Sequence, residues 1–257
     1  MTDTAYVFDQ AWHAERARLE ALEQIWDPAT TRLLTRVGVR AGWRCLEVGA
    51  GAGSTARWLA RCVGSHGCVV ATDLDTRHLL PLQAEGVQAL RHDILRDGTF
   101  EGSFDLVHAR LVVEHVGVEA LPRLVECLRP GGILVVEDLD FCSAVAADAD
   151  NLFERVLEAL LEAMTSHGFD PWLGRRLGRE LEEAGLTAVE VTAHTGVLRG
   201  GSLEAEFYRL SLISLGERAK LGALRRAEVE ELLGRLRDPA WSALLPTLVQ
   251  ATGTRAH

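Results

Sequence analysis

The sequence lacks the long apolar run that a membrane-spanning helix needs, because no stretch approaches about 20 apolar residues. Its first residues also lack the basic start and apolar core of a secretory signal. We therefore expect a cytoplasmic protein that has no membrane partner.

Paired cysteines and metal-ligand motifs are missing as well. The five cysteines are odd in number and form no CxxC pair, which argues against a disulfide framework or a zinc site. No two histidines have the HExxH spacing of a zinc enzyme. We predict no metal.

Basic clusters are also scarce. The net charge is −10 and no block of Lys or Arg occurs, whereas a nucleic-acid partner needs a basic face. The remaining composition, with 47% hydrophobic and 25% charged residues in a chain of 257, is ordinary for a globular protein with one full core. We expect a monomer or homodimer that acts on a small molecule and does not bind nucleic acid.

The first forty residues have helical spacing. Apolar residues recur from Phe8 to Trp26, and the pair Asp27-Pro28 predicts a break before a second short helix that ends at Gly38. We interpret residues 1–40 as a helical cover.

Residues 41–140 alternate between two patterns. Short apolar runs rich in Val, Leu or Ile, typical of strands buried on both faces, lie at 44–48, 68–72, 87–92, 104–108 and 133–136. Helical patterns between them lie at 54–63, 77–85 and 118–128. This alternation predicts an α/β fold with a doubly wound, mostly parallel, Rossmann-like sheet, which we expect to have seven strands.

The alternation stops after Asp140. An apolar helical face runs from Leu152 to Met164, and further helices are expected at about 172–184, 202–216 and 227–236. Strands are expected around Val189 to Ala193 and at 244–252. We interpret 141–257 as lid helices and last strands of a single domain whose core is 41–140.

A glycine-rich loop follows the first predicted strand. It has the sequence Gly49-Ala50-Gly51-Ala52-Gly53, and Ser54 opens a helix. Small residues let the backbone turn tightly and approach a ligand, at the carboxyl edge of the sheet. Nicotinamide and flavin enzymes also use such a loop, but Glu47 just before it would repel a diphosphate and would instead favour a cation.

Two further carboxylates end predicted strands. Asp73 lies twenty residues beyond Gly53, where an acid can accept hydrogen bonds from a ribose diol. Asp93 and the backbone N–H of Ile94 could read an adenine edge, or Asp93 could cap the following turn.

These stretches together resemble the class I S-adenosylmethionine (SAM)-dependent methyltransferases, of the bacterial small-molecule type. The motifs that carry the resemblance are Leu46 to Gly53, Ala71 to Asp75, Phe104 to Arg110 and Leu128 to Leu134. The resemblance implies SAM as cofactor and transfer of its methyl group to an O, N or C atom of a small organic acceptor, such as a natural product.

The resemblance also implies roles for single positions. The loop at Gly49, Ala50 and Gly51 would approach the methionine part of SAM, and Glu47 would anchor the loop or the cofactor. The remaining implied positions are Asp73 on the ribose, Leu74, Asp93 and Ile94 on the adenine, and the backbone of Ala109 and Arg110 beside the methionine amine. Because related enzymes fold their N-terminal segment over the cofactor, we hypothesise that Tyr6 and Trp12 help to close the site.

His115, just after the fourth predicted strand, is the best local candidate for a catalytic base, although packing or capping is the more common role for such a histidine. A base is needed only if the acceptor must lose a proton. The alternative function is a SAM-binding scaffold that steers a reaction other than methyl transfer, or has no catalysis, since fold and cofactor site do not determine function. A nicotinamide oxidoreductase is disfavoured by Glu47 and the glycine spacing.

Overall fold

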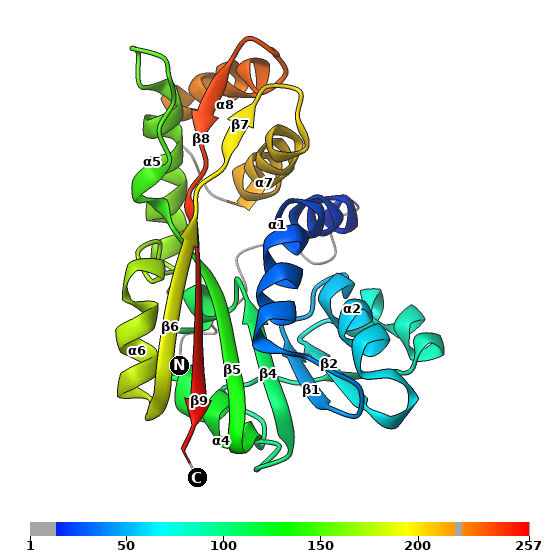
Figure 1. Ribbon diagram of the computed structural model, residues 1–257. Helices are drawn as coiled ribbons and strands as arrows, with labels where there is room; N and C mark the ends of the chain where they lie inside the picture. Colours follow the sequence, from blue (N-terminus) through cyan, green and yellow to red (C-terminus); the bar gives the residue numbers. More distant parts are fainter. Residues whose placement is uncertain (1–13, 219–222, 257) are drawn as a thin grey trace.

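The computed structural model describes residues 14–218 and 223–256, and it contains a seven-stranded sheet in the order β3-β2-β1-β4-β5-β9-β6 (Figure 1). Its strands are β1 (Arg44–Val48), β2 (Cys68–Asp73), β3 (Val87–Arg91), β4 (Phe104–Arg110), β5 (Leu128–Asp140), β6 (Leu186–His194) and β9 (Thr247–Arg255). All neighbours pair in parallel except β9, which is antiparallel to both β5 and β6. The predicted fold, a mostly parallel doubly wound sheet of seven strands, is confirmed.

Helices cover both faces of this sheet. The described helices are α1 (Glu15–Val37), α2 (Ser54–Val63), α3 (Val113–Val116), α4 (Ala120–Cys127), α5 (Leu152–Thr165), α6 (Leu177–Glu183), α7 (Leu203–Arg218) and α8 (Ala223–Arg235). One core joins the sheet to α4 and α6, and a second joins the other face to α2 and the end of α1. Alternate residues of β1 serve the two cores, Leu46 the first and Cys45 the second, because successive side chains of a strand point to opposite faces.

A third core lies beyond one end of the sheet. It joins α5, α7 and α8 to a short antiparallel pair, β7 (Val197–Arg199) with β8 (Ser242–Leu244), and it includes Trp26 of α1 (Figure 1). We call α5, α7, α8, β7 and β8 the lid. No helix of the described residues is long and apolar enough to cross a membrane.

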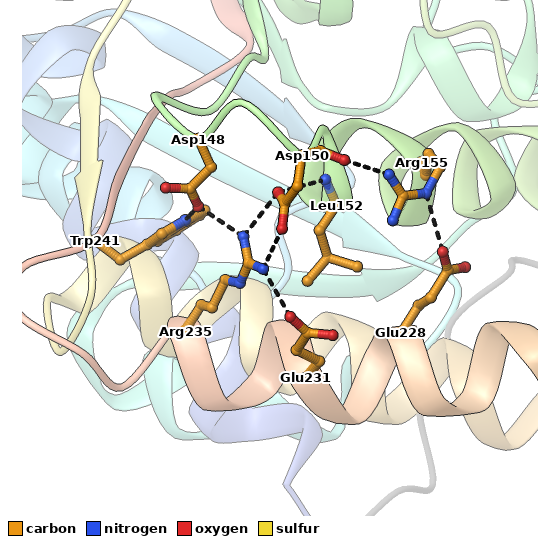
Figure 2. A network of polar contacts seen from close by, with 8 residues as sticks. All are labelled: Asp148, Asp150, Leu152, Arg155, Glu228, Glu231, Arg235 and Trp241. Atoms are coloured by element: carbon orange, nitrogen blue, oxygen red, sulfur yellow. Dashed lines mark hydrogen bonds and ion pairs between the residues drawn. The ribbon is translucent and has the colours of Figure 1, made fainter.

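Polar contacts hold the lid together (Figure 2). Arg235 of α8 binds Asp148 and Asp150, which precede α5, at 2.8 and 2.9 Å. Asp148 also accepts a hydrogen bond from the indole of Trp241, which precedes β8. The guanidinium therefore links the two ends of the lid.

The predicted break at Asp27-Pro28 is wrong, because α1 is one continuous helix of 23 residues with Pro28 inside it. Proline lacks the N–H that would donate to the preceding turn, but tertiary contacts of this turn outweigh that loss. Trp26 is buried in the lid core, and the Asp27 carboxylate accepts hydrogen bonds from Ser54 and Arg110.

Two other local predictions differ from the structure. Residues 77–85 form two 3-10 turns, Thr76–His78 and Leu80–Glu85, in place of an α-helix; Pro81 lies in the second turn. The expected strand at 244–252 is divided, since β8 ends at Leu244 and β9 begins at Thr247.

Candidate active site

The glycine-rich loop leaves the carboxyl end of β1 and leads into α2. Gly49 and Gly51 have φ of +65° and +57°, a region that residues with a Cβ rarely adopt. A Cβ on Gly49 would lie 2.3 Å from Cγ2 of Val112, so the loop packs closely on the segment after β4. At Gly49 and Gly51 the cavity is therefore lined by the backbone itself, because these residues carry no side chain.

Asp73 is the last residue of β2, and its carboxylate holds the glycine-rich loop through a hydrogen bond to the loop backbone. Its Oδ2 accepts from the N–H of Gly51 at 2.9 Å, and its Oδ1 accepts from the N–H of Asp75 at 3.0 Å. Burial raises the pKa of Asp73, while these backbone N–H groups act in the opposite direction. Each oxygen retains a lone pair, so the carboxylate can also accept the hydroxyls of a diol in the cavity.

A buried polar chain crosses the centre of the sheet behind the loop. His108 of β4 binds Glu47 of β1 through Nδ1 at 2.6 Å and Glu137 of β5 through Nε2 at 2.8 Å, and Gln250 of β9 donates to Glu137. Burial alone would lower the pKa of His108, but the two carboxylates outweigh it and raise the pKa to about 9. Glu47 also lines the cavity, so an imidazolium between two carboxylates leaves one net negative charge beside it.

The cavity continues past the ends of β2 and β3. Leu74, Asp93 and Ile94 line it, and Asp93 Oδ1 accepts from the N–H of Leu95 at 2.9 Å. The turn-capping role of Asp93 is therefore confirmed, and its side chain also lines the cavity, while contact with an adenine stays a prediction.

His92 lines the same region, and it is not among the site residues predicted from the sequence. Its Nε2 lies 2.9 Å from the carbonyl of Gly98, which can only accept, so Nε2 donates this hydrogen bond. Nδ1 is buried and has no hydrogen-bond partner. The only signal in the sequence that His92 would line the cavity is its position beside Asp93 at the end of a strand.

Helix α1 closes one side of the cavity. Arg110 at the end of β4 donates to Thr30 at 2.8 Å and to Asp27 at 3.0 Å. Glu23 accepts from the N–H of Ser54, the first residue of α2, at 2.9 Å, and burial raises the pKa of Glu23. Three carboxylate and hydroxyl side chains of α1 thus bind the sheet edge and the loop helix.

His115 lies on α3 at the opposite side of the cavity, stacked on Phe169 with ring centroids 4.9 Å apart. Burial lowers the pKa of His115 to about 3, helped by the charge of Arg18, so the ring is neutral. The neighbouring Glu114 has its Oε1 3.8 Å from Nε2 of His115, and its Oε2 accepts from the N–H of Leu139 at 3.0 Å. Burial raises the pKa of Glu114 to about 8.

The structure brings most of the predicted residues to one cavity. Those that line it are Glu47, Gly49, Ala50, Gly51, Asp73, Leu74, Asp93, Ile94, Arg110 and His115. Ala109 is fully buried within β4 and is not among the described residues that line the cavity. Tyr6 and Trp12 lie outside the described residues. No cluster of metal-ligating side chains occurs in the described part of the chain.

A Rossmann-like sheet whose last strand pair is antiparallel, with a glycine loop after β1 and an acid at the end of β2, defines a class I SAM-dependent methyltransferase. The methyltransferase-domain family model matches residues 15–191, and the chain belongs to this family. The residues present fit SAM, since Asp73 has free lone pairs for a ribose and Glu47 presents negative charge to a cation.

Relatives of known sequence agree with this class. The chain is 31% identical over 198 residues to methyltransferase str2 of Strobilurus tenacellus, covering 73% of this chain and 71% of that protein. It is 26% identical over 189 residues to methyltransferase GfsG of Streptomyces halstedii, covering 68% of this chain and 63% of that protein.

Solved structures share the fold. Phosphoethanolamine N-methyltransferase 2 of Haemonchus contortus, solved with SAM and with S-adenosylhomocysteine (SAH), has a TM-score of 0.62 at 16% identity; the match covers 100% of this chain and 61% of that chain. The [4+2]-cyclase SpnF has a TM-score of 0.56 at 16% identity, covering 91% of this chain and 82% of that chain.

Proposed function

We propose that this protein transfers the methyl group of SAM to an O, N or C atom of a small organic acceptor, such as a natural product. The observation that carries the proposal is that the glycine loop, Asp73 and a largely apolar wall from α5 and α7 line one continuous cavity. A cofactor and an acceptor can therefore meet there.

Different residues would contact the methionine, ribose and adenine parts of SAM. Gly49, Ala50 and Gly51 admit the methionine part, with the backbone at Arg110 beside it, and Glu47 faces its positive charge. Asp73 accepts the ribose hydroxyls. Leu74, Asp93 and Ile94 hold the adenine, and His92 lines the same part of the cavity.

Bound SAM supplies a methyl carbon on a sulfonium, which needs only an in-line nucleophile held about 3–3.5 Å away. When the acceptor atom carries a proton, His115 is our proposed proton acceptor, because its neutral ring lines the cavity.

Titration calorimetry with SAM, SAH and NAD tests the cofactor. We expect binding of SAM and SAH, and a loss of about tenfold or more in affinity for Asp73→Ala, since the ribose then loses its charged acceptor. Glu85→Ala is the control, because Glu85 is an exposed carboxylate paired with Arg57. Tight NAD binding without SAM binding would refute the proposal.

Formation of SAH with candidate acceptors tests the transfer. A protein that binds SAM tightly, yet produces a changed acceptor without any SAH, would be the scaffold and not the transferase.

A further inference from the structure

The part of the cavity away from the glycine loop is apolar, and we call it the acceptor lobe. Its walls are the buried face of α5 (Leu157, Leu160, Leu161 and Met164) and the rings and aliphatic side chain that α7 contributes, Phe207, Tyr208 and Leu215. Apolar walls bind ligands by removing apolar surface from water, at about 25 cal/mol per Å².

The charges that line this lobe are compensated. Arg18 of α1 donates two hydrogen bonds to Glu15, at 2.8 and 2.7 Å, and both side chains are only 2% exposed. His115 is neutral, and Glu114 is mainly protonated at neutral pH. A charged ligand would be desolvated here without meeting an opposite charge in excess, which is costly.

One polar atom in the lobe lacks a partner. Ser211 lines the cavity from α7, is 94% buried, and its hydroxyl makes no hydrogen bond within the protein. A buried hydroxyl without a partner costs about 1–3 kcal/mol. The oxygen itself is covered by protein atoms, and rotation of this short side chain about χ1 would turn it toward the cavity, where a hydrogen bond to a ligand group would recover this free energy.

We propose that the acceptor lobe binds an uncharged, mainly apolar molecule that carries a hydroxyl group, and that Ser211 hydrogen-bonds to this group. The inference rests on the proposed function, because it names the class of molecule to be methylated. It also assigns Ser211 as a residue that determines specificity, since an apolar wall alone does not distinguish a hydroxyl from a methyl group.

Four probes that share one ring system test the proposal: 2-naphthol, 2-methylnaphthalene, 2-naphthoate and 2-naphthylmethylammonium. Each is titrated into protein saturated with SAH. We expect 2-naphthol to bind at least about tenfold more tightly than either charged probe. Tighter or equal binding of a charged probe, or no binding of 2-naphthol below about 1 mM, overturns the proposal.

Two serines of the same helix provide a matched pair of variants. Ser214 is also buried and unpartnered, but it is not among the described residues that line the cavity. Ser211→Ala is expected to weaken 2-naphthol binding about 3- to 10-fold and to leave 2-methylnaphthalene unchanged, whereas Ser214→Ala changes neither. Equal effects of the two substitutions on the affinity for 2-naphthol would contradict the proposed role of Ser211.

The SAH titration that precedes these measurements separates the two proposals. A protein that does not bind SAH contradicts the proposed function itself. A protein that binds SAH but prefers a charged naphthalene contradicts only the nature of the acceptor.

Discussion

Single side chains in this protein show how position decides the chemistry of one residue type. His108 and His115 lie seven residues apart with side chains 0% and 12% exposed, yet their pKa values lie at about 9 and about 3. His108 lies between two carboxylates that favour its charged form. Burial of the His115 ring, which stacks on Phe169, and the charge of Arg18 disfavour that form.

Titration of the imidazole signals by NMR checks this contrast. We expect His108 to remain an imidazolium at pH 7.5 and His115 to remain neutral at pH 5. A neutral His108 at pH 7.5, or a protonated His115 at pH 5, would contradict the assignment.

The raised pKa of His108 also predicts how stability depends on pH. Because its pKa in the folded chain exceeds the ordinary 6.5, its contribution is complete below pH 6.5 and is lost as the pH rises through about 9. The free energy of unfolding from urea titrations should therefore fall over this interval. Glu114→Gln serves as a background variant, since the raised pKa of Glu114 lowers stability over an overlapping range, from about 4.5 to 8.

Sequence patterns predicted the cavity-lining residues that lie at the end of a recognisable strand or in the loop after it. Glu47, the loop glycines and Asp73 lie at or just after the ends of strands, and apolar runs in the sequence predict these strands. His108 was assigned to its strand without a role, because its partners Glu47 and Glu137 are 61 and 29 residues away. Ser211 was equally invisible, since its burial depends on how α7 packs against α1 and not on the sequence around it.

At the scale of elements, α1 and the lid do most to shape the cavity. Pro28 predicted a break from local rules, and the helix continues because the side chains on either side of it are fixed by Arg110 and the lid core. The lid itself depends on contacts between segments that are about 85 residues apart, such as Arg235 with Asp150. Local sequence patterns give such helices and do not give their arrangement.

Removal of the Arg235 guanidinium is expected to loosen the lid. Arg235→Ala should raise hydrogen exchange in α8 and at residues 148–152 about fivefold, because two separate segments lose their shared partner, while β1 and β4 stay protected. Arg209→Ala is the matched control: its side chain is also 23% exposed, but it pairs with Glu206 within its own helix. Equal exchange in the two variants would show that the network does not hold the lid.

The whole molecule combines two structural units around one cavity. The sheet edge and loop supply one part of the lining, and α5, α7 and α1 supply the rest. A ligand that occupies the cavity therefore contacts both units and should stabilise the fold as a whole.

This arrangement predicts a cooperative response to SAH. At about 100 times the dissociation constant, SAH should add about 2.7 kcal/mol to the free energy of unfolding, with one transition for sheet and lid. Thermal unfolding followed by circular dichroism checks this, and the increase should fall to about 1.4 kcal/mol in Asp73→Ala at the same SAH concentration if the affinity drops about tenfold. An early, SAH-insensitive transition of the lid would contradict the prediction.

The lining of the cavity also has a practical consequence for redesign. The residues that we propose to face the cofactor come mainly from 47–110, whereas the walls of the acceptor lobe belong largely to α5 and α7, which follow them in the chain. Libraries that randomise Leu157, Leu160, Met164, Phe207 and Ser211 would thus leave the cofactor contacts untouched. The molecule offers a ready starting point for evolving catalysts that methylate new compounds from an unchanged donor.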